Sequence, residues 1–106
     1  NIIPYYLYAK ATILTSDYEG YPNALIESIA MNTPVIAFDC PGGTSEIVLN
    51  NINGYLVNHQ DIDDLKNKLS TLLLQKHKFK NFKNSIKKNQ IKTVFKNYEK
   101  LIYNFI

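Results

Sequence analysis

The chain is 106 residues long, 45% hydrophobic and 12% aromatic, with a formal net charge of +3. This length and composition allow one small folded domain with its own core. They exclude a membrane-spanning helix, because no run of about 18 or more apolar residues is present. The first residues have no signal-peptide pattern, and the single cysteine, Cys40, cannot form an internal disulfide. We therefore expect a cytoplasmic protein in which Cys40 packs in a loop.

The first segments of the chain alternate between helix-like and strand-like patterns. Ile3 to Tyr8 is typical of the end of a helix, and Ala11 to Thr15 is a short, β-branched run typical of a buried parallel strand. Gly20 to Asn23 has the composition of a tight turn, and the apolar residues in Ala24 to Met31 predict a buried helix. A second buried strand is predicted at Pro34 to Phe38, so these segments form a βαβ unit.

The alternation continues through the middle of the chain. Cys40 to Gly43 is predicted to be a loop and Ser45 to Leu49 a short helix. Asn53 and Gly54 turn the chain into a third strand at Tyr55 to Val57. Asp61 to Gln75 has the apolar spacing of a helix, with acidic residues at its positive end. The order predicts an α/β fold, part of a doubly wound, Rossmann-like domain with a parallel sheet.

The last part of the chain differs in composition from the rest. Eleven of the twelve lysines lie between Lys66 and Lys100, whereas eight of the nine acidic residues lie in the first 65 positions. Helical apolar spacing occurs twice after residue 78. We divide the chain into an α/β part at 1–77 and a C-terminal helical segment at 78–106. The lysines are either a binding surface for an anionic partner or a reflection of composition bias.

Two carboxylates flank the turn that leads into the helix at Ala24 to Met31. Glu19 and Glu27 are separated by seven residues. The first turn of a helix has backbone N–H groups without intrahelical partners, and the helix dipole adds partial positive charge there. The turn is therefore a predicted site for an anionic ligand. Considered alone, Glu27 is more typical of a solvated helix carboxylate, Glu19 is equally consistent with a loop residue, and Asn23 with a helix cap.

Four blocks of sequence resemble the donor-site motif of glycosyltransferase family 4, whose members are retaining enzymes with the two-domain GT-B architecture. The blocks are Glu19 to Asn23 with Glu27, Pro34 to Ala37, Gly43 with Glu46 and Ile47, and Asn53 to Val57. Their order and spacing are those of the family, and they cover about the first 60 residues. A GT-B enzyme needs two doubly wound domains, so the resemblance implies that the chain is part of the C-terminal, donor-binding half.

The resemblance also implies roles for the residues of the turn. Glu19 would bind hydroxyls of the donor sugar and support the positively charged transition state, and Glu27 would accept hydrogen bonds from the ribose. The donor is a nucleotide sugar, expected to be a UDP-sugar, and it is a substrate, so no cofactor is implied. The candidates for binding the diphosphate and sugar oxygens through their backbone N–H groups are Gly20, Tyr21, Asn23, Ala24 and Leu25.

The chain departs from the family pattern at two positions of the helix. Ser28 replaces the usual alanine and Asn32 the usual glycine of the C-terminal turn. We expect a surface position or a helix cap to absorb these changes. The basic residues that hold the diphosphate in the family precede the segment represented here, so they are not assigned to this chain.

Other polar residues give weaker signals. Gly42, Gly43 and Glu46 are either a second loop near the donor or, for Glu46, an acid that favours its own helix dipole. Acidic residues such as Asp17 have no third ligand at a recognisable spacing, so we predict no metal. Both histidines, at positions 59 and 77, are expected at the surface.

The sequence thus predicts part of a retaining glycosyltransferase that transfers a hexose or N-acetylhexosamine to a saccharide or lipid-linked acceptor in bacterial surface glycan synthesis. Its partners would be the nucleotide-sugar donor, the acceptor and an N-terminal GT-B domain, with peripheral contact at the inner face of the cell membrane and no nucleic acid. Two alternatives stay open: a basic module that docks on membrane or nucleic acid without catalysis, and a nucleotide-sugar epimerase of the same fold.

Overall fold

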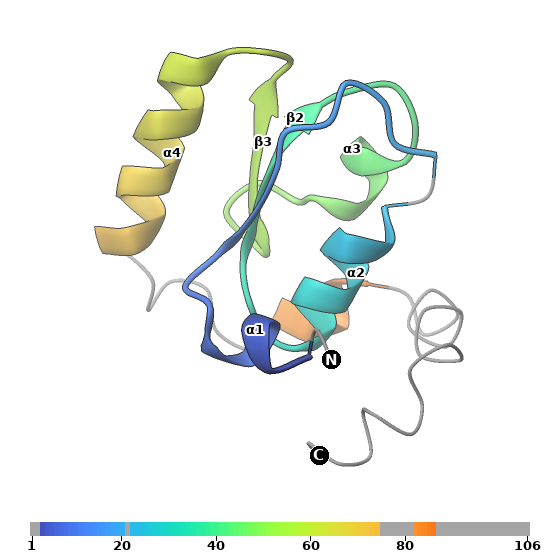
Figure 1. Cartoon of the computed structure of the whole chain (residues 1–106), viewed down its shortest axis with the longest axis vertical. Coiled ribbons are helices and arrows are strands. Elements are labelled where there is room, and N and C mark those ends of the chain that lie inside the picture. The colour runs from blue at the N-terminus through green and yellow to red at the C-terminus, as the bar shows by residue number, and fades with distance from the viewer. Residues whose placement is uncertain (1–2, 21, 75–81, 87–106) are drawn as a thin grey trace.

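Three short parallel strands form the centre of the computed structural model, which describes residues 3–20, 22–74 and 82–86. They are β1 (Thr12–Leu14), β2 (Val35–Asp39) and β3 (Gly54–Asn58), in the spatial order β1-β2-β3 (Figure 1). Ile13 pairs with Ile36, and Ile36 pairs with Tyr55, in parallel register. The predicted α/β fold with a parallel sheet is confirmed.

Helices lie on both faces of this sheet. Figure 1 shows α4 (Ile62–Leu74) on one side, with α2 (Asn23–Ala30) and α3 (Thr44–Ile47) on the other. The short helix α1 (Ile3–Tyr8) precedes β1, and a single turn of 3₁₀ helix, η2 (Phe82–Ser85), contacts α2. The helices predicted before residue 75 therefore agree with the structure to within a few residues at their ends.

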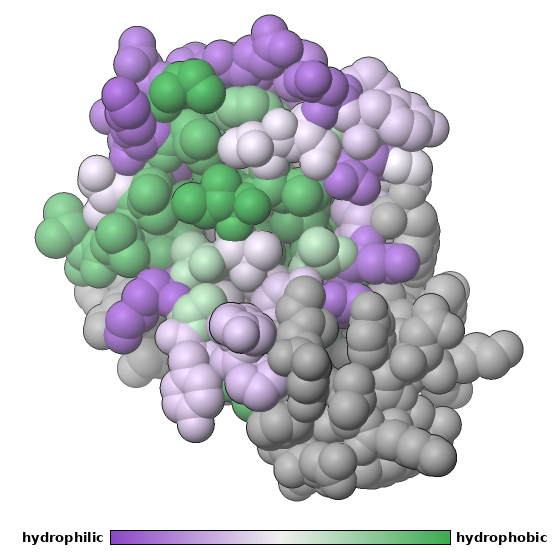
Figure 2. Space-filling view, viewed as in Figure 1, coloured by the Kyte–Doolittle hydropathy of each residue, from purple (hydrophilic) through white to green (hydrophobic). Residues whose placement is uncertain are grey.

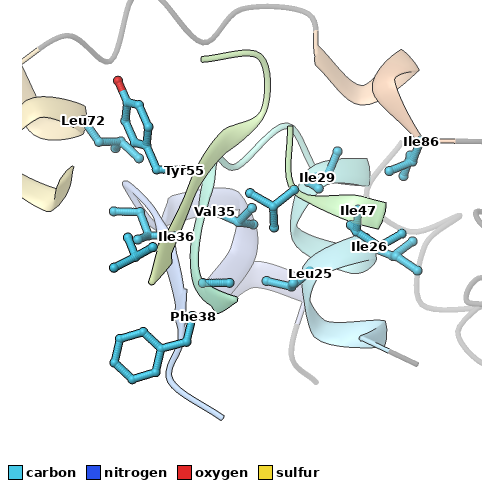
Figure 3. Close-up of a cluster of buried hydrophobic side chains, with 13 residues drawn as sticks. Leu25, Ile26, Ile29, Val35, Ile36, Phe38, Ile47, Tyr55, Leu72 and Ile86 are labelled. Atoms are coloured by element: carbon cyan, nitrogen blue, oxygen red, sulfur yellow. The ribbon is translucent and has the colours of Figure 1, made fainter. Parts of the chain in front are cut away.

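The core is continuous through the sheet because β2 is covered on both faces. Successive residues of a strand point to opposite faces. In Figure 3, Val35 lies toward Leu25 and Ile29 of α2, whereas Ile36 and Phe38 lie on the face toward α4. All but one of these five side chains are 0% exposed, and Phe38 is 4% exposed. Burial on both faces explains why the sequence of the central strand is apolar without interruption from Val35 to Phe38.

The strand β1 is less buried than its apolar sequence predicts. Ile13 is 42% exposed, and its two neighbours in β1 are half-buried. Figure 2 shows a hydrophobic surface beside α4, on the side where β1 lies in front of β2. The expectation of a strand buried on both faces is therefore wrong for β1 in this chain. The physical reason is limited cover of one face, because α4 packs on β2 and β3 while β1 lies at the edge of the sheet beyond them.

The ends of two helices are fixed by polar residues. At the end of α2, Asn32 adopts a left-handed conformation with φ 62°, and its N–H donates to the Ile29 oxygen while that of Thr33 donates to the Ser28 oxygen. This is a Schellman motif with asparagine in the place of glycine, so the helix cap absorbs this departure from the family pattern, as expected. At the start of α4, the Asp64 N–H donates to Asp61 Oδ1 at 3.0 Å.

Asn53 joins the third strand to the C-terminal part of the chain. Its side chain is fully buried, accepts from the Leu49 N–H at 2.8 Å, and donates to the Ile47 oxygen and to Ser85 Oγ, both at 2.9 Å. Ile86 is buried with the core. Residues 82–86 thus pack against the α/β part. The remainder of the predicted segment at 78–106, including most of its lysines, lies outside the described residues, and its division at residue 77 stays a prediction.

Gly54 begins β3 at a point where two backbones meet. A β-carbon at this position would lie 1.8 Å from the Val35 oxygen, so no other residue fits without moving the strands apart. In the part of the chain that the structure describes, no helix has the length and apolar character needed to cross a membrane.

Candidate functional site

Two loops at the carboxyl ends of β1 and β2 are hydrogen-bonded to each other. The Glu19 N–H donates to the Pro41 oxygen and the Gly43 N–H donates to the Glu19 oxygen, both at 3.1 Å. Loops that follow the carboxyl ends of parallel strands form the ligand-binding edge of open α/β sheets. The structure therefore places Glu19 at this edge and brings Gly42 and Gly43 beside it.

The contact between the loops depends on glycine. Gly42 has φ 115°, and a β-carbon there would lie 1.5 Å from the Glu19 oxygen. A β-carbon at Gly43 would lie 3.1 Å from Pro22 Cδ, closer than ordinary van der Waals contact. The glycine pair thus lets the second loop approach both the carboxylate-bearing residue and the start of α2.

The Glu19 side chain is held within its own loop. Ser16 Oγ donates to Glu19 Oε1 at 2.8 Å, and the glutamate is half-buried. An ionised carboxylate accepts about four hydrogen bonds, so the serine occupies only part of its capacity. Glu19 therefore has a fixed orientation and retains the ability to accept hydrogen bonds from a ligand's hydroxyl groups.

The start of α2 provides backbone donors. Pro22 is the N-cap residue, and its carbonyl oxygen accepts from the Leu25 N–H at 3.1 Å and from the Ile26 N–H at 3.2 Å. Asn23 is the first helical residue and no side chain caps this helix, so the alternative that Asn23 is the cap is wrong. The amides of Asn23 and Ala24 precede the Leu25 N–H, which is the first N–H group to donate within the helix.

The other three predicted backbone donors, Gly20, Tyr21 and Leu25, lie outside the start of the helix or are not free to bind a ligand. Gly20 is exposed, directly after Glu19. The Leu25 N–H already donates to Pro22, and its side chain is fully buried in the core, so Leu25 positions the helix. Tyr21 lies outside the described residues. Among the described candidates, the amides at the carboxyl edge are therefore those of Gly20, Asn23 and Ala24.

Glu27 is buried, and the alternative of a solvated helix carboxylate is therefore wrong. It is 8% exposed, and Tyr6 Oη donates to Glu27 Oε2 at 2.9 Å. Tyr6 belongs to α1 and lies 21 positions earlier in the chain. Sequence reasoning missed this partner, because α1 contains other tyrosines and no local pattern distinguishes the one that faces α2.

Ser28 attaches α2 to β1. Its Oγ lies 2.8 Å from Thr12 Oγ1 and 2.9 Å from the Thr33 oxygen. The carbonyl can only accept, so the serine proton goes to Thr33 and the Thr12 hydroxyl donates to Ser28. Ser28 is fully buried, which corrects the expectation of a surface position. The departure from alanine is absorbed by buried hydrogen bonds instead.

A second polar cluster bridges the loops after β1 and β3. His59 Nε2 lies 2.9 Å from Asp17 Oδ1, and Gln60 Nε2 donates to the same oxygen at 3.2 Å. The hydrogen bonds from His59 and Gln60 lower the pKa of the exposed Asp17 carboxyl. His59 is at the surface, as predicted, but its pairing with Asp17 across 42 positions was not. His77 lies outside the described residues.

The remaining polar candidates do not join a common site. Glu46 is exposed in the first turn of α3, and its N–H donates to the Gly43 oxygen at 3.1 Å. Cys40 is buried in its loop, 3.4 Å from Thr44 Oγ1, which confirms the packing role. Within residues 3–20, 22–74 and 82–86, no group of three or more His, Cys, Asp or Glu side chains is placed to hold a metal ion.

Comparison with known proteins shows the family of this chain. A model of the family "Glycosyl transferases group 1" matches residues 1–93. The chain belongs to this family. The match extends from α1 beyond η2, so it includes all three strands of the sheet.

Several curated relatives similar to this group 1 domain are named as sugar transferases. The poly(ribitol-phosphate) alpha-N-acetylglucosaminyltransferase of Staphylococcus aureus is 38% identical over 60% of the chain. The amylovoran biosynthesis glycosyltransferase AmsD of Erwinia amylovora is 37% identical over 77%, and the lipopolysaccharide 1,6-galactosyltransferase of Escherichia coli is 38% identical over 50%. The matched regions span 13%, 23% and 15% of these relatives.

Proposed function

We propose that the chain is the donor-binding part of a retaining glycosyltransferase of family 4. The enzyme would transfer a hexose or N-acetylhexosamine from a UDP-sugar to a saccharide or lipid-linked acceptor. The observation that carries this proposal is the junction of the two loops at the carboxyl edge, where Glu19 is fixed against Gly42 and Gly43 at the start of α2. The family match and the names of the relatives support a role in bacterial surface glycan synthesis.

The departing diphosphate is the most negative part of the reaction. Helix N-termini bind phosphate through free backbone N–H groups and the helix dipole. In this proposal the amides of Gly20, Asn23 and Ala24 bind the diphosphate and sugar oxygens, with Tyr21 as a further donor. Leu25 supports them from the core, because its own N–H is already hydrogen-bonded.

The two carboxylates have separate tasks in the proposal. Glu19, exposed in part at the sheet edge, accepts hydrogen bonds from donor sugar hydroxyls and stabilises positive charge at the anomeric carbon. Glu27, one turn into α2, accepts from the two neighbouring hydroxyls of the ribose. Their different partners, Ser16 for Glu19 and Tyr6 for Glu27, keep the two side chains in distinct orientations.

The chain covers a small share of its relatives, so the proposal assigns the remaining parts to a longer protein. An N-terminal GT-B domain would bind the acceptor and complete the cleft. The enzyme would work in the cytoplasm, with peripheral contact at the inner face of the cell membrane where a lipid-linked acceptor is used.

Nucleotide binding by the full-length protein tests this function. UDP, GDP and ADP are titrated by calorimetry into the wild type and into Glu27→Ala and Glu27→Gln. Loss of a charge-assisted hydrogen bond costs about 1.5 to 3 kcal/mol, so affinity for the bound nucleotide is expected to fall about tenfold or more. Asp63→Ala, an exposed acid in the first turn of α4, is the control and leaves affinity unchanged. Equal affinity and turnover in the wild type and both Glu27 variants would contradict the ribose role.

A further inference from the structure

Tyr6 is attached to the helix α2 region at both its hydroxyl and its backbone. Its Oη donates to Glu27 Oε2 at 2.9 Å, and its carbonyl oxygen accepts a hydrogen bond from Thr33 Oγ1. The side chain is 6% exposed, whereas Tyr5 and Tyr8 of the same helix are 76% and 86% exposed. The fold therefore buries Tyr6 and places its hydroxyl against the carboxylate of Glu27.

This contact has a chemical consequence for Glu27. A glutamate side chain has several rotatable bonds, and in a buried position its orientation depends on what its oxygens contact. Tyr6 supplies one neutral donor to Oε2 and leaves about three of the four acceptor positions of the carboxylate for other donors. A pair of neighbouring hydroxyls on a ligand requires such a carboxylate, held in one orientation with acceptor capacity remaining.

We infer that Tyr6 is a positioning residue that holds Glu27 in the orientation required to bind the two hydroxyls of a ribose. The inference rests on the proposed function, because it assigns Glu27 to the ribose. It adds a specificity determinant on α1, a helix that carries no other residue of the site. It also makes a distinct claim: Tyr6 contributes to discrimination between ribonucleotides and deoxyribonucleotides, and contributes nothing to binding of the diphosphate.

The test compares ribose and deoxyribose ligands in the full-length protein. Dissociation constants are measured for the tightest binder among UDP, GDP and ADP, and for its 2′-deoxy and 3′-deoxy forms. Tyr6→Phe is expected to weaken the ribonucleotide about three- to tenfold, less than the loss of a direct hydrogen bond to a charged group, because Tyr6 acts only through the orientation of Glu27. Each deoxy form keeps one of the two hydroxyls, so Tyr6→Phe should weaken its binding by a smaller factor than that of the ribonucleotide. Tyr5→Phe, an exposed neighbour in the same helix, is the matched control and leaves both values unchanged.

A double-mutant cycle shows whether Tyr6 acts through Glu27. In a Glu27→Ala background, Tyr6→Phe should have no further effect on ribonucleotide affinity. An equal loss in both backgrounds, or an equal loss for ribose and deoxyribose ligands, would show that Tyr6 only supports the fold and would overturn the inference.

Failure of the proposed function gives a different result. If Glu27→Ala binds ribose and deoxyribose forms as the wild type does, the ribose assignment itself is wrong, whatever Tyr6→Phe does. If none of the three nucleotides binds the wild type, both proposals fall. Should Tyr6→Phe unfold, 3-fluorotyrosine at position 6 keeps the ring and makes the hydroxyl a stronger donor. An unchanged ribose-to-deoxyribose ratio in that protein would then overturn the inference.

Discussion

The carbonyl oxygen of Glu19 occupies the space that a side chain at Gly42 would need. A β-carbon at position 42 would lie 1.5 Å from this oxygen and 2.5 Å from the carbon to which it is bonded. Both distances are far inside van der Waals contact, and both atoms belong to backbone, which cannot rotate away. The position of the Glu19 loop is therefore coupled to the absence of a side chain on the neighbouring loop.

Gly42→Ala is expected to displace the Glu19 loop. The left-handed backbone at position 42 alone costs a residue with a side chain about 1 to 3 kcal/mol, and the clash with Glu19 adds to it. We expect a loss of unfolding free energy of at least that size and weaker nucleotide binding, measured by urea unfolding and calorimetry. Gly20→Ala is the stability control, since the nearest described atoms to its β-carbon would be those of the Tyr18 side chain at 3.9 Å. Equal stability of Gly42→Ala and wild type would contradict the coupling.

Much of the fold could be predicted because each strand and helix is specified locally. The apolar run at Val35 to Phe38 is continuous because β2 is covered on both faces. The acidic residues at 61–64 mark the start of α4, where Asp61 caps the helix. The turn at Gly54 marks the start of β3 through a close backbone approach. At these positions the residue that marks the start of a helix or strand in the sequence also makes the local contact that fixes this start in the structure.

The contacts that position the site could not be predicted from local patterns. Tyr6 meets Glu27 across 21 positions, and Asp17 meets His59 across 42. Such pairs depend on how α1 and the loops pack, which helical or strand periodicity does not encode. The exposure of Ile13 has a similar origin, because an edge strand and a central strand have the same apolar composition. The sequence identified the carboxylates of the candidate site, but not the residues that orient them.

Ser28→Ala is expected to lower stability although alanine is the better helix former. It leaves the Thr12 hydroxyl without its acceptor and the Thr33 oxygen without its donor, in a region where Ser28 is fully buried. The expected loss is about 1 to 3 kcal/mol of unfolding free energy. Adding Thr12→Val removes one of the two orphaned groups and should recover part of the loss. Ser70→Ala, on the exposed face of α4, is the control and should change stability by less than about 0.5 kcal/mol.

The bridge between the loops after β1 and β3 makes stability depend on pH in the acid range. Hydrogen bonds from His59 and Gln60 lower the pKa of Asp17 below its ordinary value of 3.8. A carboxyl whose pKa is lowered by folding stabilises the protein above its unfolded pKa, and this contribution is lost as pH falls through the folded value. The stability difference between wild type and Asp17→Asn should therefore shrink on acidification below about pH 5. In His59→Ala, carboxyl NMR titration should show the Asp17 pKa moving up toward 3.8; an unchanged value would mean that the histidine does not hold this carboxylate.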